Sequence, residues 1–182
     1  STVLVKHFEI DLVPGDVGSA KRLETRVLRL GSQGWEGTTY RWRSDGSDAD
    51  LIDERETETF DVEDLDAPGG TREQTWTYPS RSDCFQCHTQ AAGIVLGVRT
   101  GQLHREVAYP AATDDQLRAW NHIGLFTTDI GDATAYAAWA EPGDVGATLE
   151  ARVRAYFASN CAMCHLPGGP APGNVDLRHD VP

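Results

Sequence analysis

The sequence predicts an α+β fold in which a β-rich N-terminal half, residues 1–80, packs on a helical half, residues 81–182. Before residue 80, apolar or β-branched residues alternate with polar ones, which is the period of a strand with one buried face. The residues that carry this alternation are Leu4, Phe8, Ile10, Leu12, Thr38, Tyr40 and Trp42. From about residue 81 the spacing of apolar residues becomes helical.

Within the N-terminal half, Gly31-Ser32-Gln33-Gly34 separates the two alternating runs and predicts a turn between strands. The acidic stretch from Asp48 to Asp66 is interpreted as a solvated face or loop, and Pro68-Gly69-Gly70 predicts a turn after it. Aromatic residues of this half are expected to form the core of the sheet rather than a platform for a ligand. They are Trp35, Tyr40, Trp42, Trp76 and Tyr78.

The first expected helix of the second half runs from Cys84 to Gln90. Ser80, three residues before Asp83, resembles a capping box in which Asp replaces the usual Glu. Gly93 is expected to end this helix, because glycine is common just past helix C-termini.

The second expected helix opens with Thr113 and Gln116 as a capping box and reaches His122. Leu117 and Trp120 would turn inward from it. The helix would give His122 a rigid platform, although a histidine at a helix C-terminus also commonly faces solvent.

The third expected helix covers residues 148–160. Leu149, Val153 and Phe157 recur at four-residue steps, with Tyr156 beside them. One face of this helix is therefore expected to point inward, just before the next cysteine pair.

Four cysteines fall into two pairs, and a histidine follows each pair at once. The segments are Cys84-Phe85-Gln86-Cys87-His88 and Cys161-Ala162-Met163-Cys164-His165, and both match the C-x-x-C-H haem-attachment pattern. Two thiols three positions apart on a helical turn can each add to one haem vinyl group, and the next imidazole then lies under the iron. The sequence predicts two covalently bound haem c groups, with His88 and His165 as the proximal iron ligands.

Two other roles for the cysteines fit the sequence less well. Zinc held by four cysteines usually needs pairs about 15 to 20 residues apart, whereas the gap between Cys87 and Cys161 is far longer. Structural disulfides suit an exported protein but give no reason for His88 and His165.

Groups around the motifs suggest further contacts. The stretch Leu-Pro-Gly-Gly-Pro-Ala-Pro-Gly after His165 cannot be helical, and a carbonyl near Pro167 or Pro170 is expected to accept a hydrogen bond from the His165 ring. Arg81 either approaches a haem propionate or stays solvated.

The second axial ligand of each haem is open. Met163 is the only methionine, and it lies between two attached cysteines, so it cannot reach the distal face of its own haem. The remaining candidates are His122 first and His104 next, with His7 and His179 behind them. Only 17 residues follow His165, so the second distal ligand is expected from upstream, from beyond Pro182 or from a partner, or is absent.

Composition bounds the location and the partners. The net charge of −12 and the pI near 4.8 disfavour nucleic acid as a partner, because phosphate binding needs clustered Lys and Arg. A redox protein with a basic surface is the better expectation, and the oligomeric state is open. No run of about 18 apolar residues occurs, so no membrane span is expected. Haem c points to a periplasmic or extracellular location, with an export signal that this chain does not display.

Several runs also resemble a poorly characterised family of bacterial cytochrome-like proteins. They are Val3–Phe8, Arg22–Arg26, Gly34-Trp35 through Tyr40–Trp42, Trp76–Arg81 and Asn160–Gly169. Members of this family are sometimes joined to sugar-dehydrogenase-like propellers that use a quinone cofactor. The resemblance implies a cytochrome c-like haem-binding half and electrons supplied by a dehydrogenase. Such regions are longer at both ends and often end in a Met-Pro element, so the resemblance implies either a fragment, with residues 81–182 incomplete at the C-terminus, or a shortened version of such a protein.

Electron transfer by a dihaem c-type cytochrome is therefore the predicted function, since the sequence shows no substrate motif and no second cofactor motif. A carrier is favoured over a catalyst. The alternatives are a dihaem peroxidase-type enzyme, in which an iron without a sixth ligand binds peroxide, and a subunit of a haem-containing electron-conducting assembly.

Overall fold

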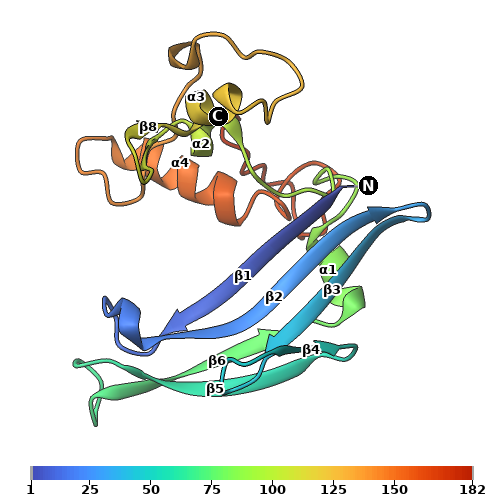
Figure 1. Ribbon diagram of the computed structural model, residues 1–182, viewed down its shortest axis with the longest axis vertical. Helices are drawn as coiled ribbons and strands as arrows, with labels where there is room; N and C mark the ends of the chain where they lie inside the picture. Colours follow the sequence, from blue (N-terminus) through green and yellow to red (C-terminus); the bar gives the residue numbers. More distant parts are fainter. Residues whose placement is uncertain (1, 182) are drawn as a thin grey trace. The chain divides into compact units, whose positions relative to one another are not determined.

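The computed structural model describes residues 2–181 and is shown in Figure 1. The chain divides into two compact units, Ser1–Cys87 and His88–Pro182. The sequence predicts a division after residue 80, whereas the first unit extends through the helix that carries Cys84 and Cys87. The first unit is rich in strands, and most helices lie in the second, so the α+β class is supported.

An antiparallel sheet of four strands forms the first layer of the first unit (Figure 1). Its strands are β1 (Val3–Asp11), β2 (Ala20–Gly31), β3 (Gly34–Trp42) and β4 (Ala49–Ile52), in that order. The predicted turn between β2 and β3 is confirmed, with Gly31 paired to Gly34. Gly34 has a φ of +112°, which an L-residue rarely adopts, so the turn requires glycine there.

A second hairpin lies against this sheet, made of β5 (Glu56–Glu63) and β6 (Thr71–Tyr78). The interpretation of Asp48–Asp66 as a loop is wrong, because this stretch holds β4 and β5. The alternative of a solvated face agrees with the structure, since acidic residues such as Asp50 and Asp61 are exposed. In β5 alternate residues face inward, and Phe60 and Val62 are buried there. This period-2 pattern is hard to see in the sequence because most of its neighbours are acidic. The predicted turn at Pro68-Gly69-Gly70 is confirmed, with positive φ at both glycines.

The core between these layers is aliphatic and aromatic, but it is not the predicted aromatic set. Leu23, Ile52, Phe60 and Tyr78 are its buried members, and Trp76 packs at the edge. Trp35, Tyr40 and Trp42 are only half-buried, which corrects their assignment to the core.

Charged groups tie the hairpin to the sheet beside this core. Arg41 pairs with Glu56 at 2.7 Å and with Glu58 at 2.9 Å, and Tyr78 donates its hydroxyl to Glu58 at 2.8 Å. Burial and the Glu58 carboxylate raise the pKa of Tyr78. The phenol therefore remains a hydrogen-bond donor across the ordinary pH range.

The second unit is built from short elements. They are α2 (Thr100–Leu103), β7 (Glu106–Ala108), β8 (Thr113–Asp115), α3 (Gln116–His122) and α4 (Leu149–Asn160), with 3₁₀ turns at Val17–Ser19 in the first unit and Ala133–Ala135 in the second. Leu103, Leu117 and Ala133 form its buried cluster, and Trp120 packs against them. Leu117 and Trp120 thus turn inward as expected.

Two details of the second unit differ from the sequence reading. The N-cap of α3 is Asp115, whose carboxylate accepts from the Arg118 N–H, and Thr113 lies in β8. The predicted capping box at Thr113 is therefore wrong, because a strand pairing takes that residue. Within the described residues, no helix is both long and apolar enough to cross a bilayer.

Candidate functional site

The first C-x-x-C-H segment begins on α1 (Arg81–Cys87), and its capping box is confirmed. The Asp83 carboxylate accepts from the Ser80 N–H at 2.9 Å, and the Asp83 N–H donates to the Ser80 hydroxyl at 3.4 Å. Arg55 adds an ion pair to Asp83 at 2.5 Å. The helix begins and ends three residues earlier than predicted, with Cys84 inside it and Cys87 as its last residue.

Cys84 packs on the sheet at a glycine. A Cβ at Gly37 of β3 would lie 2.8 Å from both the Cβ and the Sγ of Cys84, which is closer than real side chains approach. Burial raises the pKa of the Cys84 thiol, although the Arg26 charge opposes this. Cys87 is exposed. The sheet therefore holds one thiol of the pair in place and leaves the other open.

His88 has the orientation of a metal-ligating histidine. Its Nδ1 lies 2.6 Å from the carbonyl oxygen of Ile94, so this nitrogen carries the proton and donates. The Nε2 is then the unprotonated nitrogen that can bind iron, and the hydrogen bond raises its basicity. Sequence reasoning missed this carbonyl.

The Ile94 backbone adopts an unusual conformation at this contact. Its φ is +62°, in the left-handed region, where a β-branched residue costs about 1–3 kcal/mol. The Ile94 N–H donates to the Thr89 carbonyl at 2.9 Å, which closes the loop around His88. Strained backbone of this kind is concentrated at functional sites.

The second segment follows α4, and the prediction of a helix over residues 148–160 is confirmed. Thr148 is the N-cap of this helix, and its hydroxyl accepts from the Ala151 N–H at 3.2 Å. Beyond Cys161 the chain continues as a helical turn. The N–H groups of Cys164 and His165 both donate to the Cys161 carbonyl, at 3.0 and 2.9 Å. Both cysteines and the histidine thus share one turn, as haem attachment requires.

The loop after His165 folds back on this turn. The Ala171 N–H donates to the Cys164 carbonyl at 3.2 Å, and a Cβ at Gly169 would lie 2.3 Å from that same oxygen. Glycine is therefore required at residue 169. The predicted hydrogen bond from the His165 ring to a carbonyl near Pro167 or Pro170 is not formed within residues 2–181, because Gly169 and Ala171 direct the loop toward Cys164 instead.

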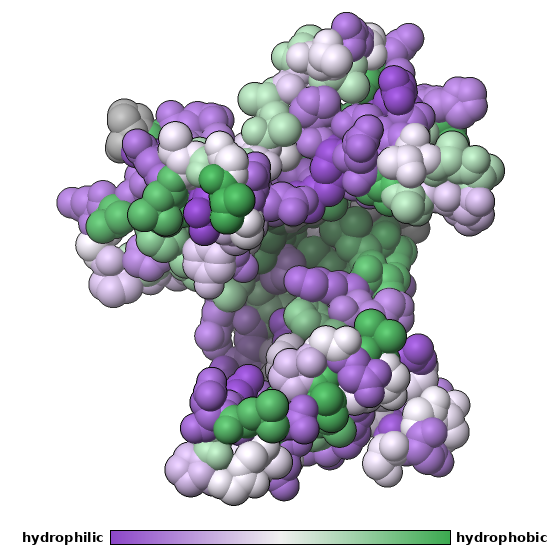
Figure 2. Space-filling model, turned by 90° about the vertical axis from the view of Figure 1, so that its left-hand side faces the viewer, coloured by the Kyte–Doolittle hydropathy of each residue, from purple (hydrophilic) through white to green (hydrophobic). Residues whose placement is uncertain are grey.

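The apolar side of α4 is turned outward, contrary to the prediction. Leu149, Val153 and Phe157 are 69%, 37% and 38% exposed, and the buried residue of this helix is Ala155. The helix packs through its small side chains, with Ser159 accepting from the Gln102 amide of α2 at 2.9 Å. Apolar side chains exposed at the surface appear green in Figure 2.

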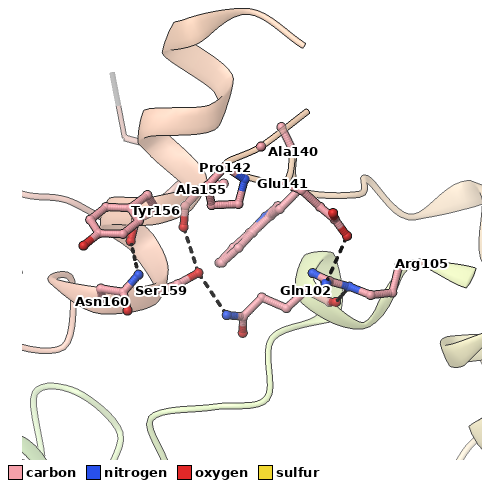
Figure 3. Close-up of a pocket in the computed structure, with 11 residues that line it drawn as sticks. Gln102, Arg105, Ala140, Glu141, Pro142, Ala155, Tyr156, Ser159 and Asn160 are labelled. Atoms are coloured by element: carbon pink, nitrogen blue, oxygen red, sulfur yellow. Dashed lines mark hydrogen bonds and ion pairs between the residues drawn. The ribbon is translucent and has the colours of Figure 1, made fainter. Parts of the chain in front are cut away.

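A cleft of about 270 Å³ lies between α2 and α4, and Figure 3 shows Gln102 and Ser159 pointing toward one another across it. Arg105 and Glu141 pair at 3.3 Å on its other side. The indole of Trp139 fills the space above Gly101, where a Cβ would lie 2.2 Å from the ring. The Trp139 indole thus packs directly on α2 beside the cleft.

Among the candidate distal ligands, His104 and His122 differ in their surroundings. The Nδ1 of His104 is buried and lies 2.9 Å from Asp115 Oδ2, poorly aligned for a hydrogen bond. No contact of its Nε2 is found in the described part of the chain. His122 is exposed at the C-terminus of α3.

His7 and His179 are engaged elsewhere. His7 is exposed on β1 and contacts the Thr25 hydroxyl at 2.7 Å. The His179 ring stacks on Trp139 with centroids 4.6 Å apart, and its Nδ1 contacts Asp180. Arg81, the candidate for a propionate contact, pairs with Asp53 at 3.0 Å.

The donor set fits haem c at both segments. None of the four cysteines, all of which lie in the described residues, forms a disulfide. Each pair occupies a helical turn next to a histidine, and the His88 ring is held through Nδ1. Within residues 2–181, no group of three or more His, Cys, Asp or Glu side chains is arranged to hold a bare metal ion.

Comparisons with known proteins identify no relative of this chain. No protein-family model matches the chain, and neither a curated protein nor a solved structure matches it.

Proposed function

We propose that this chain is a dihaem c-type cytochrome that transfers electrons outside the cytoplasm. The observation that carries the proposal is the first segment, where two thiols on one helix precede a histidine whose Nδ1 is bonded to the Ile94 carbonyl. This arrangement leaves Nε2 to bind iron. The second segment repeats the cysteine and histidine spacing on a helical turn.

Haem c, when bound, supplies a one-electron iron couple whose potential depends on its axial ligands and on the hydrogen bonds around them. The chain's own residues hold and orient it. Cys84 and Cys87 anchor the porphyrin, Gly37 leaves room for the first of these sulfurs, and the Ile94 carbonyl fixes the tautomer of His88. Covalent anchoring keeps the cofactor through many redox cycles.

The partner and the location belong to the same proposal. The net charge of −12 favours a redox partner with a basic surface. The resemblance to bacterial cytochrome-like proteins favours a dehydrogenase as electron donor and a periplasmic or extracellular location, where haem c is attached.

The test is to count covalent haems after expression in a host that matures c-type cytochromes. We expect intact-protein mass spectrometry and the pyridine haemochrome spectrum to give two haems per chain. The double variants Cys84→Ala/Cys87→Ala and Cys161→Ala/Cys164→Ala should each retain one. Met163→Leu, which changes the residue between the second pair, is the control and should retain both. An unmodified wild-type polypeptide would refute the proposal.

A further inference from the structure

The loops that follow the two C-x-x-C-H segments lie side by side at Ala91 and Gly168. Gly168 lies beside Ala91, such that a Cβ at Gly168 would be 3.8 Å from the Ala91 Cβ, an ordinary van der Waals distance. Ala91 is three residues after His88, and Gly168 is three residues after His165. All four residues belong to the same compact unit. The fold therefore brings together two segments that are far apart in the sequence.

Both connections from histidine to contact point are short. Three residues span at most roughly 11 Å even when fully extended. Neither stretch is extended, because the Gly93 N–H donates to the Gln90 carbonyl at 3.0 Å and the Gly169 N–H donates to the Leu166 carbonyl at 2.9 Å. Each proximal histidine is thus held close to the Ala91–Gly168 contact. In Figure 1 these are the yellow-green and red loops.

The positions of the histidines are fixed on both sides of this contact. On the first side, the Ile94 carbonyl holds the His88 ring at 2.6 Å. On the second side, the Leu177 N–H donates to the His165 carbonyl at 3.0 Å, and the Ala171 N–H donates to that of Cys164. The separation between the two sites is therefore set by packed loops rather than by a flexible tether.

We infer that the two haem sites form one closely coupled redox pair, which exchanges electrons within the chain. This inference rests on the proposed function. With haem bound at both sites, one electron would pass from the reduced site to the oxidised one, so that one would be oxidised as the other is reduced, with no bond formed or broken. Two neighbouring sites also interact through their charges, since Coulomb energy rises as separation falls. Reduction of one site then makes reduction of the other less favourable.

The test compares the Soret circular dichroism of the two-haem protein with the sum of the spectra of the two one-haem variants described above. Coupled porphyrins are expected to give a paired positive and negative band that the sum lacks. A redox titration of the two-haem protein should likewise differ from the sum of the one-haem titrations. Additive spectra together with additive titrations would overturn the inference while leaving the haem count, and with it the proposed function, intact.

A second comparison does not depend on the one-haem variants. Ala91→Trp places a large side chain at the exposed contact with Gly168 and should weaken the paired Soret band while both haems remain attached. Ala137→Trp makes the same change at another exposed position of the same unit and should leave the band unchanged. Equal spectra for the two variants, with both haems present, would also count against the inference.

Discussion

At the scale of single residues, Gly37 shows how the sheet makes room for the Cys84 sulfur. Glycine inside a strand weakens the strand and often marks close approach of another backbone. Here the approaching group is Cys84 of α1, which packs on β3 at Gly37. Gly37 is the residue that pairs with Leu28 of β2. Without a Cβ at residue 37, the Cys84 sulfur lies directly against the strand.

Gly37→Ala is therefore expected to reduce haem attachment at the first segment only. The added Cβ would lie 2.8 Å from Cys84, and relieving such overpacking costs about 1–3 kcal/mol. Haem per chain should fall from two toward one by the pyridine haemochrome spectrum, with a lower midpoint in urea unfolding. The control is Gly31→Ala, whose nearest neighbouring atom would be 3.7 Å away. Full haem loading and unchanged stability in Gly37→Ala would contradict this role.

At the scale of elements, α1 is held by charge as much as by packing. No residue of α1 is buried, but Asp83 at its first turn joins the cap at Ser80 to Arg55. The hydrogen bond from Arg55 and the Ser80 N–H hold the pKa of the Asp83 carboxyl well below its usual range. A carboxylate at a helix N-terminus also complements the helix dipole.

This gives α1 a defined dependence on pH. Because the pKa of Asp83 is lower in the folded chain, its stabilisation is complete above the ordinary carboxyl pKa of about 3.9 and is lost as the pH falls below that value. Asp83→Asn should lower the unfolding free energy at pH 7 and flatten its decline below pH 4. Asp61→Asn, at an exposed position of β5, is the control and should keep the wild-type slope. Parallel curves for wild type and Asp83→Asn would contradict the assignment.

Elements with local signals could be predicted from the sequence. The cap at Ser80 and the turn at Gly34 are fixed by neighbouring residues, so both could be predicted. Strand β5 could not be predicted, because acidic residues obscure its alternation of apolar and polar residues. The outward orientation of the apolar face of α4 could not be predicted either. Its packing depends on the Gln102–Ser159 contact with a distant helix, and small residues such as Ala155 carry no hydrophobic signal.

The candidate site likewise combines features with local sequence signals and features that depend on tertiary contacts. The cysteine and histidine spacing is local, so both C-x-x-C-H segments are found directly in the sequence. The Ile94 carbonyl, Gly37 and the Ala91–Gly168 contact lie outside the motifs. They depend on a left-handed isoleucine or on tertiary approach, neither of which has a sequence signature.

At the scale of the whole molecule, the chain combines two C-x-x-C-H segments with a strongly acidic composition. A net charge of −12 attracts basic proteins over a long range, which raises the rate of encounter more than the final affinity. The charge arises because acidic residues outnumber basic ones by 28 to 16.

Electron exchange with a basic redox protein should accordingly slow as salt is added. The screening length falls from about 30 Å at 0.01 M to about 8 Å at 0.15 M ionic strength, and steering of this kind raises association rates by about 10-fold or more. Stopped-flow mixing of the reduced protein with a basic, oxidised acceptor should show the second-order rate constant falling by about that factor between these conditions. An acidic acceptor is the matched control, and its rate should rise with salt because repulsion is screened. A rate with the basic acceptor that stays constant or increases would exclude charge steering and point to an uncharged docking surface.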